Sequence, residues 1–253
     1  MRRALSLSLG LALSGCLLVT PPSGHMGSTD GGADANLQPV TASAACGEIA
    51  IVACTGYENC CHDGHTVTMN DCITALQTSC DSRLGPVFRD PKTGFSPVVA
   101  AEVLAEGRAL ANACDPGIIA WYNSRSGLQR AMQGTIPAGQ LCAMRGDDAA
   151  AYFACRDFEN GCIGDNSAGY YCSARHGDDL ACHSDPDCVA DDYCEGGAPG
   201  GNPILGFPGH CRPRLATGAP CTVDGACASF LCDTATTHLC VDVTSASAYC
   251  GLH

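Results

Sequence analysis

The sequence is poor in positive charge and in large apolar side chains. It has 13 Lys and Arg residues against 26 Asp and Glu, and Lys92 is its single lysine. A chain with a formal net charge of −13 has no general attraction to phosphate backbones, which excludes nucleic acid as a partner. Aromatic residues are 6% of the chain, and Ala and Cys supply about half of its hydrophobic 46%. Covalent cross-links are therefore expected to replace much of a conventional core.

The sequence also lacks the short motifs that mark common enzymes. It has no G-x-S-x-G turn for an acyl-transfer serine. It has neither G-x-G-x-x-G nor G-x-x-x-x-G-K-[ST], so nucleotide chemistry has no support. Ser and His residues occur without a spacing that groups them. The sequence therefore predicts no catalytic residue, no bound metal and no cofactor.

The first sixteen residues read as an export signal. Residues 1–3 are basic and residues 4–13 are apolar, a run too short to span a bilayer. The run ends in Leu13-Ser14-Gly15-Cys16, which resembles the lipobox of bacterial lipoproteins. The resemblance implies cleavage before Cys16, acylation of its thiol and amine, and a stable lipid anchor in the membrane. In that family an Asp after the cysteine retains the protein at the inner membrane, so Leu17 favours the outer membrane, with the protein facing the cell surface. An ordinary signal peptide with an incidental cysteine is the alternative.

Composition divides the chain into four parts. Residues 1–15 are the predicted signal peptide, and residues 16–45, rich in Pro, Gly, Ser, Thr and Asp, are a predicted flexible tether. Residues 46–135 are predicted to form a disulfide-linked helical domain, and residues 136–253 a cysteine-rich repeat domain.

The twenty cysteines after Cys16 are disulfide candidates, because export leads to an oxidising compartment. Seven lie in residues 46–135 and thirteen follow. Both counts are odd, so complete pairing within one chain needs at least one disulfide between the two parts. The candidates are Cys46, Cys54, Cys60, Cys61, Cys72, Cys80, Cys114, Cys142, Cys155, Cys162, Cys172, Cys182, Cys188, Cys194, Cys211, Cys221, Cys227, Cys232, Cys240 and Cys250.

The part before residue 136 carries helical signals. Ser96-Pro97 is an N-cap followed by proline at the first helical position, and the motif at 115–117, Asp-Pro-Gly, ends the run. Apolar and small residues follow helical spacing between them, at Val99, Val103, Gly107, Leu110 and Cys114.

Two cysteine pairs in this part share a spacing of eight residues, just over two helical turns. Two antiparallel helices could therefore be joined by Cys46–Cys80 and Cys54–Cys72. Trp121 and Tyr122 are expected to cover the small core between the helices.

The part after residue 135 contains a cysteine repeat of about 40 residues, which is typical of stacked supersecondary units. The second and third copies share the pattern C-x5-C, four or five residues, C, a variable loop and C, and the first copy is a looser version of it. Residues 137–139 (Pro-Ala-Gly) and 218–220 (Gly-Ala-Pro) lead into the first and third copies, whereas only Ala181 marks the second. The cysteines of the three copies are Cys142, Cys155, Cys162 and Cys172; Cys182, Cys188, Cys194 and Cys211; and Cys221, Cys227, Cys232 and Cys240.

The second copy begins CHSDPDCVADDYC, which resembles the N-terminal cysteine-rich module of Dickkopf proteins. The resemblance extends more weakly over residues 139–250, and it implies a small, disulfide-knotted architecture rich in β-hairpins. The CxxC and vicinal CC elements of the animal module are absent from this half, so its receptor-binding role is not carried over. The resemblance rests on Cys182, Asp185, Asp187, Cys188, Tyr193 and Cys194.

The run from Cys60 to His65, Cys-Cys-His-Asp-Gly-His, has three interpretations. Its thiolates and imidazoles are suitable zinc or copper donors, although the C-x2-C and H-x3-H spacings are missing. A second interpretation is a catalytic helix similar to the CC-x-x-H-D-x-C helix of secreted phospholipases A2. The run departs from that pattern, because no cysteine follows Asp63 at the required place. We favour a loop whose adjacent cysteines bond to different partners.

An acidic cluster in the second copy could supply oxygen ligands for calcium. It lacks the residue order of an EF-hand, and a solvated acidic face is the preferred interpretation. The cluster comprises Asp185, Asp187, Asp191, Asp192 and Glu195.

Together these patterns predict a small disulfide-rich fold, with an N-terminal α-helical segment followed by cystine-stapled β-hairpin and loop repeats. The predicted function is a lipid-anchored, non-catalytic binding or structural module of the cell envelope, with a protein or surface ligand as partner. The Gly/Pro loop 196–210 is the predicted contact surface, because a rigid scaffold lowers the entropy cost of ordering a loop on binding. The alternatives are a metal-dependent hydrolase that uses the Cys60–His65 region and a disulfide-rich protease inhibitor.

Overall fold

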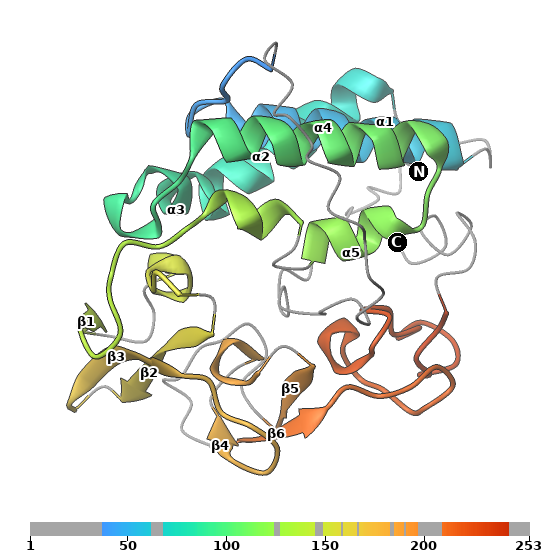
Figure 1. Ribbon diagram of the computed structural model, residues 1–253. Helices are drawn as coiled ribbons and strands as arrows, with labels where there is room; N and C mark the ends of the chain where they lie inside the picture. Colours follow the sequence, from blue (N-terminus) through green and yellow to red (C-terminus); the bar gives the residue numbers. More distant parts are fainter. Residues whose placement is uncertain are drawn as a thin grey trace, which may run out of the picture.

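In the part of the chain that the structure describes, five α-helices precede six short strands (Figure 1). The computed structural model describes residues 37–61, 68–123, 127–144, 149–157, 159–165, 167–182, 185–189, 191–196 and 209–242. The helices are α1 (Ala45–Cys60), α2 (Met69–Arg83), α3 (Gly85–Arg89), α4 (Pro97–Ala113) and α5 (Gly117–Asn123). The strands are β1 (Leu141–Ala143), β2 (Asn160–Asp165), β3 (Gly169–Ala174), β4 (Ala181–Cys182), β5 (Asp192–Glu195) and β6 (Gly209–Pro213). Among the described helices, none has the length and hydropathy needed to cross a bilayer.

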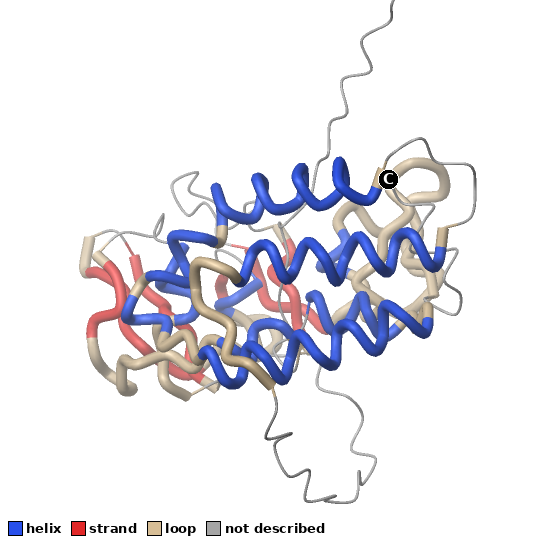
Figure 2. The backbone as a smooth tube through the Cα atoms, turned by 90° about the horizontal axis from the view of Figure 1, so that it is seen from above, coloured by secondary structure: helices blue, strands red, loops and turns tan. Residues whose placement is uncertain are grey.

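The three long helices lie side by side, with α1 packed against both α2 and α4 (Figure 2). Cys46–Cys80 and Cys54–Cys72 join α1 to α2, so the two helices run antiparallel, and these are the pairs that the eight-residue spacing predicts. Helix α2 begins at a capped turn, where the Thr68 hydroxyl accepts a hydrogen bond from the Asp71 N–H at 3.2 Å. Cys80 is its one buried residue. The two disulfides therefore contribute more than apolar packing to the docking of α2.

The limits of α4 agree with the sequence signals. The Ser96 hydroxyl accepts a hydrogen bond from the Val99 N–H, and Pro97 is the first helical residue. Cys114 caps the other end in the left-handed conformation, with φ 54°, and its disulfide to Cys60 ties this end of α4 to the last turn of α1.

Trp121 fills the space between α5 and α4 and is 5% exposed. Its indole Nε1–H donates a hydrogen bond to the Val103 carbonyl oxygen at 2.9 Å. The ring lies against Gly107, where an added Cβ would come within 2.5 Å of Cζ2. Tyr122 is half-buried against the same core, which contains Ala45, Cys46, Ile49, Val52, Cys80, Val87, Phe88, Val103, Leu104, Ala111, Ile118, Ile119, Trp121, Leu128, Met132, Phe230 and Leu231.

One boundary predicted from composition, the end of the tether at residue 45, differs from the structure. Residues 37–44, assigned to the tether, include Val40 and Ala42, which pack against the helical core, and the Val40 N–H donates to the Pro97 carbonyl oxygen. The boundary at residue 135 carries no free linker. There residues 92–94 and 133–135 form three backbone hydrogen bonds, and the Thr135 N–H also bonds the Ala154 carbonyl oxygen. Composition does not reveal these contacts, because they join residues that are far apart in the sequence.

Two small antiparallel sheets follow, with strand orders β1-β3-β2 and β4-β6-β5. The third cysteine copy has isolated bridges in the matching places, Pro220 with Leu239 and Cys232 with Cys240. The third copy lies against the helices, because its Phe230 and Leu231 belong to the helical core. The helices and the three copies therefore form one packed body.

Candidate functional site

The three cysteine copies share one disulfide pairing, in which the first cysteine bonds the third and the second bonds the fourth. The Cα atoms of each first-to-third pair are 5.9 Å apart, and those of each second-to-fourth pair are 5.5 Å apart. The first-to-third bonds are Cys142–Cys162, Cys182–Cys194 and Cys221–Cys232. The second-to-fourth bonds are Cys155–Cys172, Cys188–Cys211 and Cys227–Cys240.

Each copy begins six residues before its first cysteine, with a residue that makes a parallel bridge to the second cysteine. These residues are Ile136, His176 and Leu215. In every copy the N–H of this residue bonds the carbonyl oxygen of the residue before the second cysteine, at 2.7–2.9 Å. The copies therefore share a backbone framework that extends beyond their cysteines.

A left-handed residue stands three positions before the first cysteine in all three copies. It is Gly139 (φ 77°), Asp179 (φ 67°) or Gly218 (φ 83°), and its N–H donates to the carbonyl oxygen of the fourth cysteine. The second copy, whose small-residue lead fits less well in the sequence, makes the same turn. Asp179 takes the place of glycine there, and a search for glycine and proline misses it although Asp tolerates this conformation. Alignment of the copies on their first cysteines would have found the position.

The third and fourth cysteines of each copy lie directly opposite each other on paired strands or bridges. In the first and third copies the segment between these cysteines therefore forms a loop on a cystine-stapled base, and in the second copy the described ends of the segment pair in the same way. The segments are 163–171, 195–210 and 233–239. Of the predicted contact loop 196–210, residues 197–208 lie outside the described residues, and Gly209 and His210 pair with β4 and β5 at its base.

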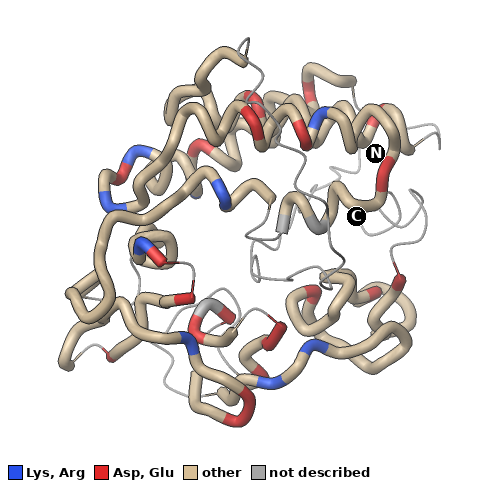
Figure 3. Tube along the Cα trace, viewed as in Figure 1, with Lys and Arg blue, Asp and Glu red and all other residues tan. Residues whose placement is uncertain are grey.

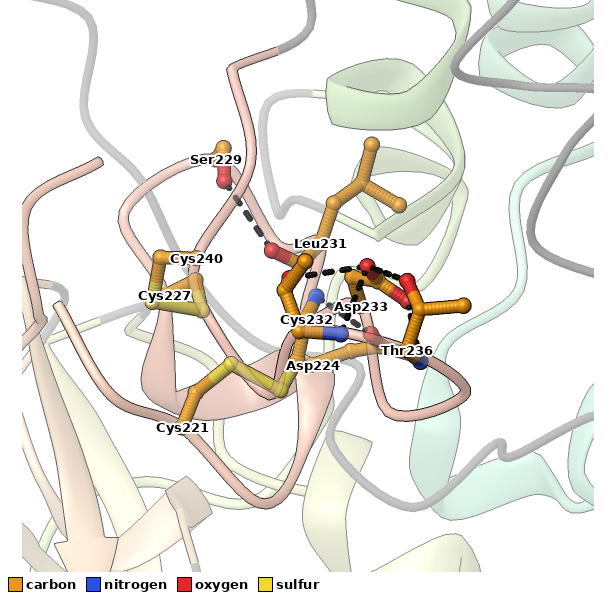
Figure 4. The surroundings of a disulfide bond; sticks show 10 residues. Cys221, Asp224, Cys227, Ser229, Leu231, Cys232, Asp233, Thr236 and Cys240 are labelled. Atoms are coloured by element: carbon orange, nitrogen blue, oxygen red, sulfur yellow. Dashed lines mark hydrogen bonds between the residues drawn. A yellow bond between two sulfur atoms is a disulfide. The ribbon is translucent and has the colours of Figure 1, made fainter. Parts of the chain in front are cut away.

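Side-chain carboxylates fix two of these loops. Asp165 accepts hydrogen bonds from the Ser167 and Ala168 N–H groups, at 2.7 and 2.9 Å, at the tip between β2 and β3. In the third copy Asp233 accepts from the N–H and hydroxyl groups of Thr236 and Thr237 (Figure 4). These hydrogen bonds hold the pKa of the Asp233 carboxyl well below its usual range. Both tips are ordered by their own sequence before any ligand binds.

Asp185 of the acidic cluster has a structural role that recurs in the third copy. Its Oδ1 accepts the Cys194 N–H at 2.9 Å, as the Asp224 Oδ1 accepts the Cys232 N–H at 2.8 Å (Figure 4). Each aspartate stands three residues before the second cysteine of its copy and bonds the third. Burial raises the pKa of Asp185, and the Cys194 N–H and Arg214 act in the opposite direction.

Three members of the cluster, Asp185, Asp191 and Asp192, act electrostatically on Arg214, whose side chain is 3% exposed. Its guanidinium lies 4.0 Å from Asp185 Oδ2 and 4.5 Å from the centre of the Phe230 ring. Asp187 and Asp192 are 7% and 6% exposed, so the predicted solvated face is in part a buried junction between the second and third copies. Burial and then Asp178 and Asp191 raise the pKa of Asp192.

The described part of the chain offers no thiolate for a metal. Each group of three cysteines close enough to share an ion consists of half-cystines. Cys60 bonds Cys114, and Cys61 is also disulfide-bonded. His62, Asp63 and His65 lie outside the described residues, as do Cys16 and Cys250.

Acidic residues are spread over the helices and the copies alike (Figure 3). Several of them pair with arginines at the surface: Arg108 bonds Glu48, and Arg130 lies 2.7 Å from Glu106. In the second copy Arg212 lies 3.0 Å from Asp179 and 3.5 Å from Glu195. Exposed pairs of this kind contribute at most about 1 kcal/mol each.

No family model, no curated protein and no solved structure matches this chain.

Proposed function

We propose that this protein is a lipid-anchored, non-catalytic binding or structural module of the outer membrane. Cys16 carries the lipid, and residues 17–36 connect it to the body of the protein. The three cysteine copies hold their loops at fixed positions for a protein or a surface ligand. Because pairing consumes the thiols of every described cysteine, the same residues support a scaffold better than they support a metal-dependent hydrolase.

The observation that carries this proposal is the shared pairing of the three copies. The three copies have equivalent cystine-stapled bases, and the tips at Asp165 and Asp233 are ordered by local hydrogen bonds. A loop that is ordered in the free protein loses little conformational entropy on binding. The arrangement therefore favours recognition by preformed loops.

Replacing Cys16 tests the anchor. In cells that export the protein, the wild type is expected to enter the detergent phase of a Triton X-114 separation, and Cys16→Ser is expected to stay in the aqueous phase. The reason is that the variant has no thiol to acylate. Ser23→Ala lies in the same segment and serves as the control that partitions like the wild type. A wild type that remains in the aqueous phase would contradict the anchor.

The same cystine-stapled loops support a protease inhibitor as the second candidate function. A soluble form that starts at residue 17 can be titrated into trypsin, chymotrypsin and subtilisin. The binding module predicts no stoichiometric inhibition. A one-to-one end point with any of these enzymes would contradict the binding module and favour the protease inhibitor.

A further inference from the structure

We infer that the Cys60–Cys114 disulfide is a site of thiol–disulfide exchange, which a protein dithiol opens while the other disulfides between described cysteines stay closed. Exchange requires a thiolate to reach one sulfur of the bond, so it depends on access. Nine disulfides join described cysteines, and this is the one in which both cysteines are half-buried. In Cys54–Cys72 and Cys142–Cys162 one cysteine is buried, and in the other six both are.

The bond lies at the ends of two helices that run in the same direction. The Val40 N–H, just before α1, bonds the Pro97 carbonyl oxygen at the start of α4. Cys60 is the last residue of α1, and Cys114 is the C-cap of α4. Neither last turn has a basic side chain, so the disulfide joins two helix ends that carry like partial charges. Opening the bond therefore removes a restraint on two ends that repel each other.

The backbone of Cys114 favours opening in a second way. Its φ of 54° lies in the left-handed region, which is disfavoured for a residue with a Cβ. The disulfide restrains the residue at this position, whereas a reduced Cys114 is free to leave that conformation.

The packing of α1 against α4 does not depend on this bond. Val52 of α1 and Val103 of α4 are both 0% exposed and belong to the same core. Next to the bond, the Asn59 side-chain amide donates a hydrogen bond to the Ala111 carbonyl oxygen at 3.4 Å. The reduced helices should therefore stay together and keep the two thiols close enough for the bond to form again.

The exchange takes place in two steps. One thiolate of the dithiol attacks a sulfur of the Cys60–Cys114 bond and releases the other cysteine as a thiolate, which leaves a mixed disulfide. The second thiolate of the dithiol attacks the mixed disulfide and releases the remaining cysteine. The dithiol is oxidised to a disulfide, the Cys60–Cys114 bond gains two electrons, and the protons of the two attacking thiols pass to the two cysteines.

Limited reduction of the exported wild-type protein by dithiothreitol, with iodoacetamide as the trap and tryptic mapping as the readout, tests the inference. We expect Cys114 to be alkylated at least about tenfold faster than Cys142 and Cys155, because a disulfide with a buried cysteine must open locally before it reacts. Cys60 should be alkylated together with Cys114. The informative peptides contain one cysteine each, and they are 109–125 with Cys114, 131–145 with Cys142 and 146–156 with Cys155.

Trp121 reports whether the helices stay packed during the fast step. Its fluorescence and the far-ultraviolet circular dichroism should match those of the untreated protein. Oxidised dithiothreitol should then restore the link between peptide 109–125 and the peptide that ends at Arg83. Equal alkylation rates at Cys114, Cys142 and Cys155 would overturn the inference, and so would loss of the native Trp121 emission in the fast step.

Two double variants locate the fast step. Cys60→Ser with Cys114→Ser should abolish it. Cys142→Ser with Cys162→Ser is the matched control, because that bond also has one half-buried cysteine, and the fast step should remain. A fast step that persists without Cys60 and Cys114 would assign the exchange to another disulfide. If a double variant does not fold, the rates measured on the wild type decide the inference.

Discussion

Gly107→Ala is expected to lower the free energy of unfolding by about 2 kcal/mol. The added Cβ would stand 2.5 Å from Cζ2 and 2.6 Å from Cε2 of Trp121. Overpacking of this kind costs about 1–3 kcal/mol, and the better helix propensity of alanine returns less than about 1 kcal/mol. The indole must move away from α4, which weakens its hydrogen bond to the Val103 carbonyl oxygen. Denaturant unfolding with intact disulfides measures the loss, and Trp121, the single tryptophan, reports it by fluorescence.

Gly47→Ala is the matched control, because Gly47 is also a helical glycine. An added Cβ there meets the Gln77 side chain at 3.6 Å, an ordinary contact. Its stability should equal or exceed that of the wild type by up to about 1 kcal/mol. Equal stability of Gly107→Ala and Gly47→Ala would contradict the packing described for Trp121.

Phe230→Ala is expected to cost about 3–4 kcal/mol, the largest effect of a single apolar replacement in the third copy. Phe230 is 3% exposed, lies in the helical core and supports the guanidinium of Arg214. The left-handed backbone at Phe230 does not contribute to this change in the free energy of unfolding, since alanine and phenylalanine are equally disfavoured at φ 56°. The unfolding midpoint reported by Trp121 should fall, although Trp121 is more than a hundred residues away in the sequence.

His238→Ala provides the control for Phe230. His238 has φ 55° in the same copy, but its side chain is exposed. The replacement should change stability by less than about 0.5 kcal/mol. If Phe230→Ala leaves the Trp121 transition unchanged, the third copy does not unfold together with the helices, and the single packed body is wrong.

Local helical signals correctly predicted α4 and the two disulfides between α1 and α2. An N-cap, a proline and a terminating Asp-Pro-Gly are local signals, and they locate α4 within a residue or two. Cys46–Cys80 and Cys54–Cys72 follow from the same regularity, because two cysteines eight apart share one face of a helix.

The pairing within the cysteine copies was beyond the sequence, because four cysteines allow three pairings. The choice depends on hairpin register, which places the third cysteine opposite the fourth. The docking of Phe230 is also a long-range contact that no local pattern records. The prediction of a solvated acidic face was wrong in part for a related reason. Composition does not reveal that Asp185 accepts a hydrogen bond from a backbone N–H and lies near a buried Arg214.

The intact mass of the exported protein before and after reduction tests the central claim, that this is a cystine-stapled scaffold rather than a metal enzyme. The account predicts ten disulfides, so reduction should raise the mass by about 20 Da, at two hydrogens for each bond. Native spectra should show no bound metal. Free thiols together with the extra mass of a transition metal would contradict the account and favour a metal-dependent hydrolase.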